Sequence, residues 1–196
     1  MPYSYHLTRK DFTPIPLDKP AQDVIGTLLP ICQNGFVSYL HDFKRIYQID
    51  SRKNRLETLY SCKGDTIFNS VSADENGIFW IGSNYGLSYY SMEKQQCINI
   101  PNSLINEINS LICDQRGRVW IGADSKLFAH LIQGGEFILY GESDGIILNE
   151  YLEKPRLLST QGDIYMGGVN GLLCINKQLP NEPNAPPILE LADVLG

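Results

Sequence analysis

The sequence predicts an all-β protein assembled from four-stranded antiparallel units, and three observations support this. Short apolar runs alternate with turn-forming residues, and the 196 residues include 17 glycines, 11 prolines and 11 tyrosines, which is typical of many short strands joined by tight turns. No stretch shows the apolar period of an amphipathic helix. One short pattern also recurs along the chain at a nearly constant spacing, which indicates repeated structural units.

The recurring pattern is a tight turn followed by a strand that ends in glycine. It is clearest at residues 74–82 (DENGIFWIG) and 114–122 (DQRGRVWIG), and looser copies lie at 161–167 (QGDIYMG) and 34–39 (NGFVSY). The turn glycines are Gly35, Gly77, Gly117 and Gly162, so successive copies are 42, 40 and 45 residues apart. One four-stranded blade of a β-propeller has about this length. The repeat therefore predicts a partial β-propeller of about four blades.

The third copy shows why each piece of the unit should take its place. Residues 108–112 have the composition of a first strand, and Asp114–Gly117 has turn residues that bond their own backbone or accept positive φ. Arg118–Ile121 is the expected returning strand, with Trp120 as its large packing residue. Residues 127–129 and 136–140 are the expected third and fourth strands.

The repeat also predicts the organisation of the chain. We expect blades at residues 21–62, 63–101, 102–140 and 141–179. Residues 1–20 are expected to supply the outer strand of a preceding blade, around residues 12–16. Residues 180–196 have the composition of a proline-rich linker, at 180–187, followed by the start of another β domain. Both ends therefore suggest a segment of a longer protein.

Charge and composition restrict the partners. The formal net charge is −6, which argues against nucleic acid and anionic membrane surfaces, because both attract basic patches. No apolar run is long enough to span a bilayer, and the first residues lack the features of a signal peptide. We therefore expect contact with a membrane only through a parent protein.

The cysteines do not predict a metal site or a cofactor. The five cysteines are odd in number and form no C-x-x-C pair, so a zinc site is not expected. Cys113 and Cys174 lie in apolar strand patterns and are expected to be small buried core residues. One disulfide stays open as an alternative.

Residues 80–87 (WIGSNYGL) resemble the two-component-regulator propeller repeat. The second copy carries the glycine and leucine that follow the tight turn in that family, whereas the third copy has Lys126 where glycine is usual, so its turn is predicted to differ. The first copy matches poorly, with Ser38 at the tryptophan position and Leu40 at the glycine position.

The fourth copy extends this resemblance. Residues 144–146, 149–151, 162–172 and 186–188, in this order, resemble the last sensor blade of hybrid two-component sensors of Bacteroides type. In that family the blade precedes an immunoglobulin-like domain, a membrane helix and a histidine kinase. The resemblance implies a periplasmic sensor segment of an inner-membrane protein, truncated before the immunoglobulin-like domain, that detects a carbohydrate and signals to the kinase.

Strand alternation predicts where a ligand would bind. In a meander of four strands, the turn between strands two and three lies at the same end as the link to the next blade. Polar and aromatic side chains of these loops suit a hydroxyl-rich ligand such as an oligosaccharide; otherwise they are only turn formers. The candidate ligand-binding residues are Asn84, Tyr85, Asn106, Glu107, Asp124, Lys126, Asn149, Glu150, Tyr151 and Asn170. Trp80 and Trp120, in contrast, are expected to pack between blades.

Catalysis finds little support in the sequence. The three histidines, His6, His41 and His130, have no metal-ligand spacing, and no G-x-S-x-G turn occurs. We therefore expect no catalytic residues and no enzyme activity. Two alternatives remain: a propeller enzyme of the metal-dependent lyase type, with His41 and His130 as its candidates, or a scaffold that binds no ligand. An open arc of blades would expose apolar faces, so self-association as a homodimer is also expected.

Overall fold

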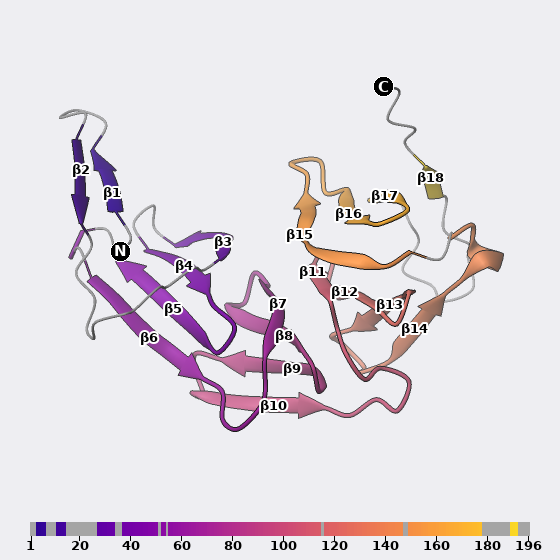
Figure 1. The fold of residues 1–196 in the computed structure, drawn as a ribbon, viewed down its shortest axis with the longest axis horizontal. Coiled ribbons are helices and arrows are strands. Elements are labelled where there is room, and N and C mark those ends of the chain that lie inside the picture. The colour runs from indigo at the N-terminus through magenta and orange to yellow at the C-terminus, as the bar shows by residue number, and fades with distance from the viewer. Residues whose placement is uncertain are drawn as a thin grey trace. The chain divides into compact units, whose positions relative to one another are not determined.

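The computed structural model describes residues 3–6, 11–14, 27–33, 37–50, 52–53, 55–114, 116–146, 149–177 and 189–191. The chain divides into two compact units, residues 1–68 and residues 69–196, which we call the N-terminal and the C-terminal unit. Within the described ranges the regular structure consists of strands β1 to β18 and one short 3₁₀ helix, η1 (Glu142–Asp144) (Figure 1).

The N-terminal unit contains a hairpin and one four-stranded sheet. The hairpin pairs β1 (Tyr3–His6) with β2 (Asp11–Pro14). The sheet has the order β3 (Thr27–Gln33), β4 (Val37–His41), β5 (Arg45–Asp50) and β6 (Arg55–Ser61), and neighbouring strands are antiparallel. Leu40, Tyr47 and Leu56 form a buried cluster on it.

Three further sheets follow in chain order, and each is a meander of four strands (Figure 1). The second sheet consists of β7 (Phe68–Ala73), β8 (Ile78–Ser83), β9 (Gly86–Ser91) and β10 (Gln96–Ile100). The third consists of β11 (Ser110–Cys113), β12 (Arg118–Ala123), β13 (Lys126–Leu131) and β14 (Phe137–Tyr140). The fourth consists of β15 (Tyr151–Leu158), β16 (Ile164–Gly168), β17 (Gly171–Ile175) and β18 (Leu189–Leu191). The predicted fold of about four four-stranded antiparallel blades is confirmed.

Strands also form near the two ends of the chain. Residues 11–14, which were predicted to lie in the outer strand of a preceding blade, pair with residues 3–6 in the hairpin. At the other end, β18 pairs with β17 as the outer strand of the fourth sheet, where we had expected a linker and the start of another domain. The physical reason is that only three strands of this sheet precede residue 180. The open edge of β17 therefore takes a partner from beyond the proline-rich stretch.

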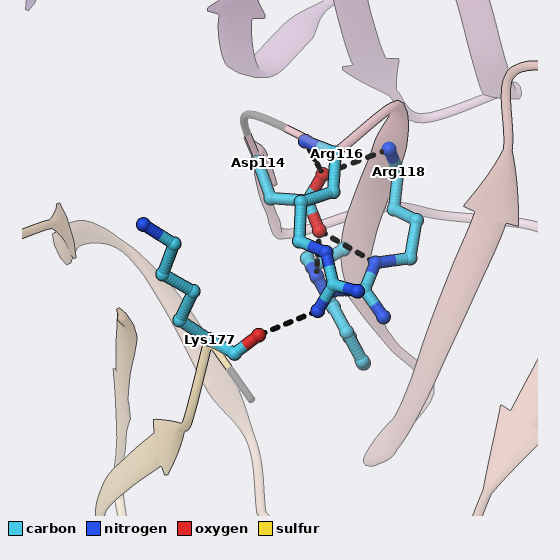
Figure 2. Close-up of polar contacts among 5 residues, drawn as sticks. Asp114, Arg116, Arg118 and Lys177 are labelled. Atoms are coloured by element: carbon cyan, nitrogen blue, oxygen red, sulfur yellow. Dashed lines mark hydrogen bonds and ion pairs between the residues drawn. The ribbon is translucent and has the colours of Figure 1, made fainter. Parts of the chain in front are cut away.

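The repeated aspartate organises the turn between the first two strands of a blade. Asp114 Oδ1 accepts hydrogen bonds from the backbone N–H groups of Arg116 and Arg118, at 2.8 and 2.9 Å. Its Oδ2 accepts from Arg118 Nε at 2.6 Å and from Trp120 Nε1 at 3.2 Å. Figure 2 shows this carboxylate between the two arginines, with Arg116 also donating to the carbonyl of Lys177, which lies just after β17. The aspartate thus closes the turn and anchors the tryptophan that follows.

The same arrangement recurs one blade earlier. Asp74 Oδ1 accepts from the N–H groups of Asn76 and Ile78, and its Oδ2 accepts from Trp80 Nε1 at 3.2 Å. The difference is that Ile78 stands where the third sheet has Arg118, so the buried ion pair of the third sheet is absent from this turn. The common spacing of aspartate, glycine and tryptophan is therefore explained by hydrogen bonds within each turn, from the backbone and the indole to the aspartate.

The tryptophans pack between sheets, as predicted. Trp80 is buried with residues of β11 and β12, and its ring lies 5.4 Å from that of His130 in the third sheet. Trp120 is buried with Ile164, Met166 and Ile175 of the fourth sheet. Side chains alternate along a strand, so a middle sheet presents one face to each neighbour. All six residues of β12 are consequently buried.

The first strands of successive blades are joined by side chains. Ser70 Oγ of β7 accepts from the backbone N–H of Leu111 at 2.9 Å, and Ser72 Oγ accepts from that of Cys113 at 3.1 Å. Arg156 of β15 reaches β7 as well, where it donates to Ser70 Oγ and, at 2.7 Å, to the carbonyl of Val71. Burial lowers the pKa of this guanidinium. The contacts align the three sheets of the C-terminal unit along their first strands.

Candidate functional site

Three turns and two links gather at one end of the C-terminal unit, which we call the loop face. The turns are residues 84–85, 124–125 and 169–170, and the described parts of the links are residues 101–109, 141–146 and 149–150. The backbone N–H of Ile108 donates to the carbonyl of Ser83 at 3.0 Å, and that of Val169 donates to the carbonyl of Glu150 at 3.0 Å. The link from each blade therefore lies against the turns, which confirms the expectation from strand alternation.

Glycines at the strand ends allow this close approach. A Cβ atom added at Gly122 would lie 2.4 Å from Cγ of Tyr151, and one at Gly82 would lie 2.4 Å from Cγ2 of Ile108. The first side chain brought in by each link thus sits directly on the backbone of the preceding blade. This explains why the repeated strand ends in Trp-Ile-Gly in both copies.

The tight turns differ in the way the sequence predicted. The β8–β9 turn has positive φ at Gly86, at 89°. The β12–β13 turn has Lys126 at this position, and positive φ falls instead on Asp124 and Ser125, at 49° and 59°. Two consecutive positive φ values define a type I′ hairpin turn, which favours asparagine and glycine. Asp124 suits the first of these two positions, whereas Ser125 stands at the second position, where glycine is usual.

Most of the predicted site residues reach the surface of the loop face. Tyr85 is 68% exposed. The exposed set also contains Asn106, Glu107, Asp124, Lys126, Glu150 and Asn170, and Asn84 is half-buried. A hydrogen bond holds the side chain of Glu107 in place, since its Oε1 accepts from Asn69 Nδ2 at 3.1 Å.

Two predicted site residues lie in the interior instead. Tyr151 is 3% exposed and packs with Trp120 and Met166, and burial raises its pKa to about 12. Asn149 is 6% exposed; its Oδ1 accepts from the N–H of Asn170, and its Nδ2 donates to the carbonyl of Gly171. Both side chains hold the loops in place and do not face a ligand. The reason for their burial is that each side chain lies against a glycine, which has no side chain to keep it at a distance.

A groove of about 540 Å³ lies at the second blade's part of the loop face, lined by residues 84–87, 99–103, 105 and 106. The turn residues and Asn106 were predicted, whereas Asn99 and Asn102 were missed. Asn99 belongs to the outer strand β10, which we did not consider as a contributor. Four asparagines within two short segments were the available signal in the sequence.

The sheet of the N-terminal unit carries a polar cluster at the turn between β4 and β5. Asp42 Oδ1 accepts from the N–H groups of Lys44 and Arg45, and its Oδ2 accepts from the hydroxyl of Tyr47 at 2.6 Å. Burial is the main cause that raises the pKa of Tyr47. Phe43, at the tip, is 64% exposed. The weak match of the first copy to the repeat hid this turn from sequence reasoning.

The two histidines considered for lyase chemistry are both buried. His41 is 3% exposed and His130 is 2% exposed. His130 lies between the rings of Trp80 and Phe137, with centroid distances of 5.4 and 4.5 Å, and burial lowers its pKa. Neither histidine therefore presents an imidazole to the surface.

These sheets and their repeated turns define a segment of a β-propeller. Residues 102–125 match the family "Two component regulator propeller", which confirms the predicted resemblance for this part of the chain. The match covers the turn that Asp114 closes, strand β12 and the β12–β13 turn. No curated protein matches the sequence.

Two solved structures of the extracellular domain of BT4673 from B. thetaiotaomicron share the fold. One is described as belonging to a one component system and the other to a hybrid two component system. Each is 20% identical to this chain, with TM-scores of 0.57 and 0.58. They cover 84% and 85% of this chain, which corresponds to 21% and 22% of their own length. The chain therefore spans about a fifth of these neighbours.

Proposed function

We propose that the chain is a ligand-sensing propeller segment from the extracytoplasmic part of a two-component sensor. The observation that carries the proposal is the repeat at residues 102–125, which matches the two component regulator propeller family and lies in a chain that shares its fold with the extracellular domain of a hybrid two component system. The loop face supplies the surface for binding. Its exposed side chains include asparagine, tyrosine, lysine and acidic residues, which can bond sugar hydroxyls.

Carbohydrate detection and signalling to a histidine kinase complete the proposal. Binding at the loop face would contact links that run directly into the first strands β11 and β15, which side chains join to each other and to β7. A ligand that favours one arrangement of these strands would shift the population of the sensor toward it. Only the difference in affinity between the two arrangements can drive the signal.

A thermal-shift screen of the 196-residue chain against oligosaccharides tests the proposal. A ligand that binds the folded state at about 100 times its Kd adds about 2.7 kcal/mol of stability. For a chain of this length, that raises Tm by about 5 °C or more. The expected result is a concentration-dependent rise with at least one sugar. A panel of neutral and acidic oligosaccharides with no rise at millimolar concentration would contradict the proposal.

We also propose that copies of the chain self-associate. Ile98, Leu139 and Leu157 are 36%, 49% and 59% exposed, and exposed apolar side chains on outer or first strands favour pairing. Light scattering across a concentration series should then give about twice the chain mass of 22.1 kDa. A constant monomer mass at high concentration would refute self-association and leave the sensing proposal intact.

A further inference from the structure

The groove beside the β8–β9 turn has the construction of a small binding site. Its floor is apolar and buried, because Leu87 and Ile105 are only 3% and 5% exposed. The link packs against the turn: a Cβ at Gly86 would lie 3.4 Å from the carbonyl oxygen of Ile105. The volume of 540 Å³ falls in the range of small-molecule sites, about 300–1,000 Å³.

The side chains around this floor are polar and uncharged. Asn84, Asn99, Asn102 and Asn106 contribute to the wall, and none of the lining residues is charged. Each asparagine amide can donate and accept at once, which matches the dual role of a hydroxyl group. A charged ligand would meet no opposite charge here, and an anion would also face the net charge of −6.

An aromatic ring stands at the rim of the groove. Tyr85 is 68% exposed, so its ring is available to stack on an apolar face, such as the C–H face of a sugar ring. The adjacent Pro101 adds a second rigid apolar surface. Polar amides around an aromatic platform favour ligands that carry hydroxyl groups on one edge and C–H groups on the other.

Local hydrogen bonds hold the groove in shape. Ser83 Oγ accepts from the N–H of Tyr85 at 3.1 Å and donates to the carbonyl of Gly86 at 3.1 Å. Asn102 Oδ1 accepts from the N–H of Leu104 at 2.8 Å, which orders the start of the link. A site that is ordered before binding loses less conformational entropy when the ligand arrives.

We propose that this groove binds a segment of an uncharged oligosaccharide, with the asparagines on its hydroxyls and Tyr85 stacked on a ring. This inference rests on the proposed sensing function. It adds that the binding site lies on the second blade and that the site discriminates against charged sugars.

The experiment is an NMR titration of the ¹⁵N-labelled 196-residue chain. The probes are cellotetraose, xylotetraose and mannotetraose, with tetragalacturonate as the charged comparison. We expect at least one neutral probe to shift the amide signals of residues 84–87 and 99–106, and tetragalacturonate to leave them unchanged. Tyr85→Ala and Asn106→Ala should each weaken binding by about five- to tenfold, as expected for losing one stacking or hydrogen-bond contact.

Asn76→Ala is the matched control, because Asn76 is an exposed asparagine of the same sheet at the opposite end, in the turn between β7 and β8. It should bind like wild type. If a neutral probe binds and neither Tyr85→Ala nor Asn106→Ala weakens that binding, the groove is not the binding site, but the proposed sensing function still stands. Equal binding of tetragalacturonate at these residues would overturn the selection against charge. If no probe binds and the wider thermal screen is also negative, the groove and the sensing function both fail.

Discussion

Gly122→Ala is expected to destabilise the C-terminal unit through one defined collision. The new Cβ would lie 2.4, 2.5 and 2.6 Å from Cγ, Cβ and Cδ2 of Tyr151, whereas carbon atoms in contact prefer about 3.5–4.0 Å. The φ of Gly122 lies outside the left-handed region, so backbone strain does not contribute. The tyrosine must therefore move by about 1 Å or more to regain contact distance.

The cost follows from where Tyr151 sits. It is 3% exposed and packs in one cluster with Trp120, Ile164 and Met166, so its displacement disturbs the contact between the third and fourth sheets. Overpacking of this kind costs about 1–3 kcal/mol. For a chain of this length, that lowers Tm by about 2–12 °C.

Urea denaturation followed by tryptophan fluorescence measures this loss. Gly141→Ala is the control, because a Cβ at Gly141 has no atom within 4 Å and should change stability by less than about 0.5 kcal/mol. In a double-mutant cycle, Gly122→Ala should cost less in a Tyr151→Ala background than in the wild-type background, because the clashing ring is then gone. A Gly122→Ala variant as stable as wild type would refute the reasoning that this glycine is required by close approach.

Three further predictions concern the turns and the buried histidine. Asp114→Ala leaves Arg118, which is 5% exposed, without its carboxylate, so it should lower the free energy of unfolding by about 3–5 kcal/mol. Asp74→Ala, whose turn has no arginine, should lower it by less in the same urea titration. Equal losses for the two variants would argue against a contribution of the ion pair. Ser125→Gly removes a side chain from a φ of 59° and should stabilise by about 0.5 kcal/mol in thermal unfolding, whereas a loss would show that the turn is relaxed. Burial lowers the pKa of His130 below its usual 6.5, so the unfolded chain binds more protons; stability should be full above pH 6.5 and fall as pH drops below it. His130→Phe should flatten this dependence below pH 6.5, and an unchanged slope would assign it to other groups.

The sequence was sufficient for features with local causes. Aspartate, glycine and tryptophan at fixed spacing close a turn and anchor a ring within nine residues, so the strands β7, β8, β11 and β12 follow directly from the pattern. The changed β12–β13 turn was also predictable, because Lys126 stands where the repeat has glycine and the conformation of a tight turn depends on its own residues.

Features that depend on contacts with neighbouring blades could not be predicted from the local sequence pattern. Tyr151 resembled an exposed loop residue, because its burial depends on the bare backbone of Gly122, 29 residues earlier in a different sheet. The bulge between Tyr151 and Arg156 shifts the register of β15, and no repeat position signals it. Asn99 joins the groove only because the following link folds back against the β8–β9 turn.

We propose that the loop face of the C-terminal unit binds the ligand. Hydrogen–deuterium exchange of the chain, with and without a sugar that raises Tm, tests this most directly. We predict slower exchange in residues 84–87, 101–109 and 169–171, with little change in the turns at 74–77, 116–117 and 159–162 at the opposite end. Protection of those opposite turns, with exchange at the loop face unchanged, would contradict ligand binding at the loop face.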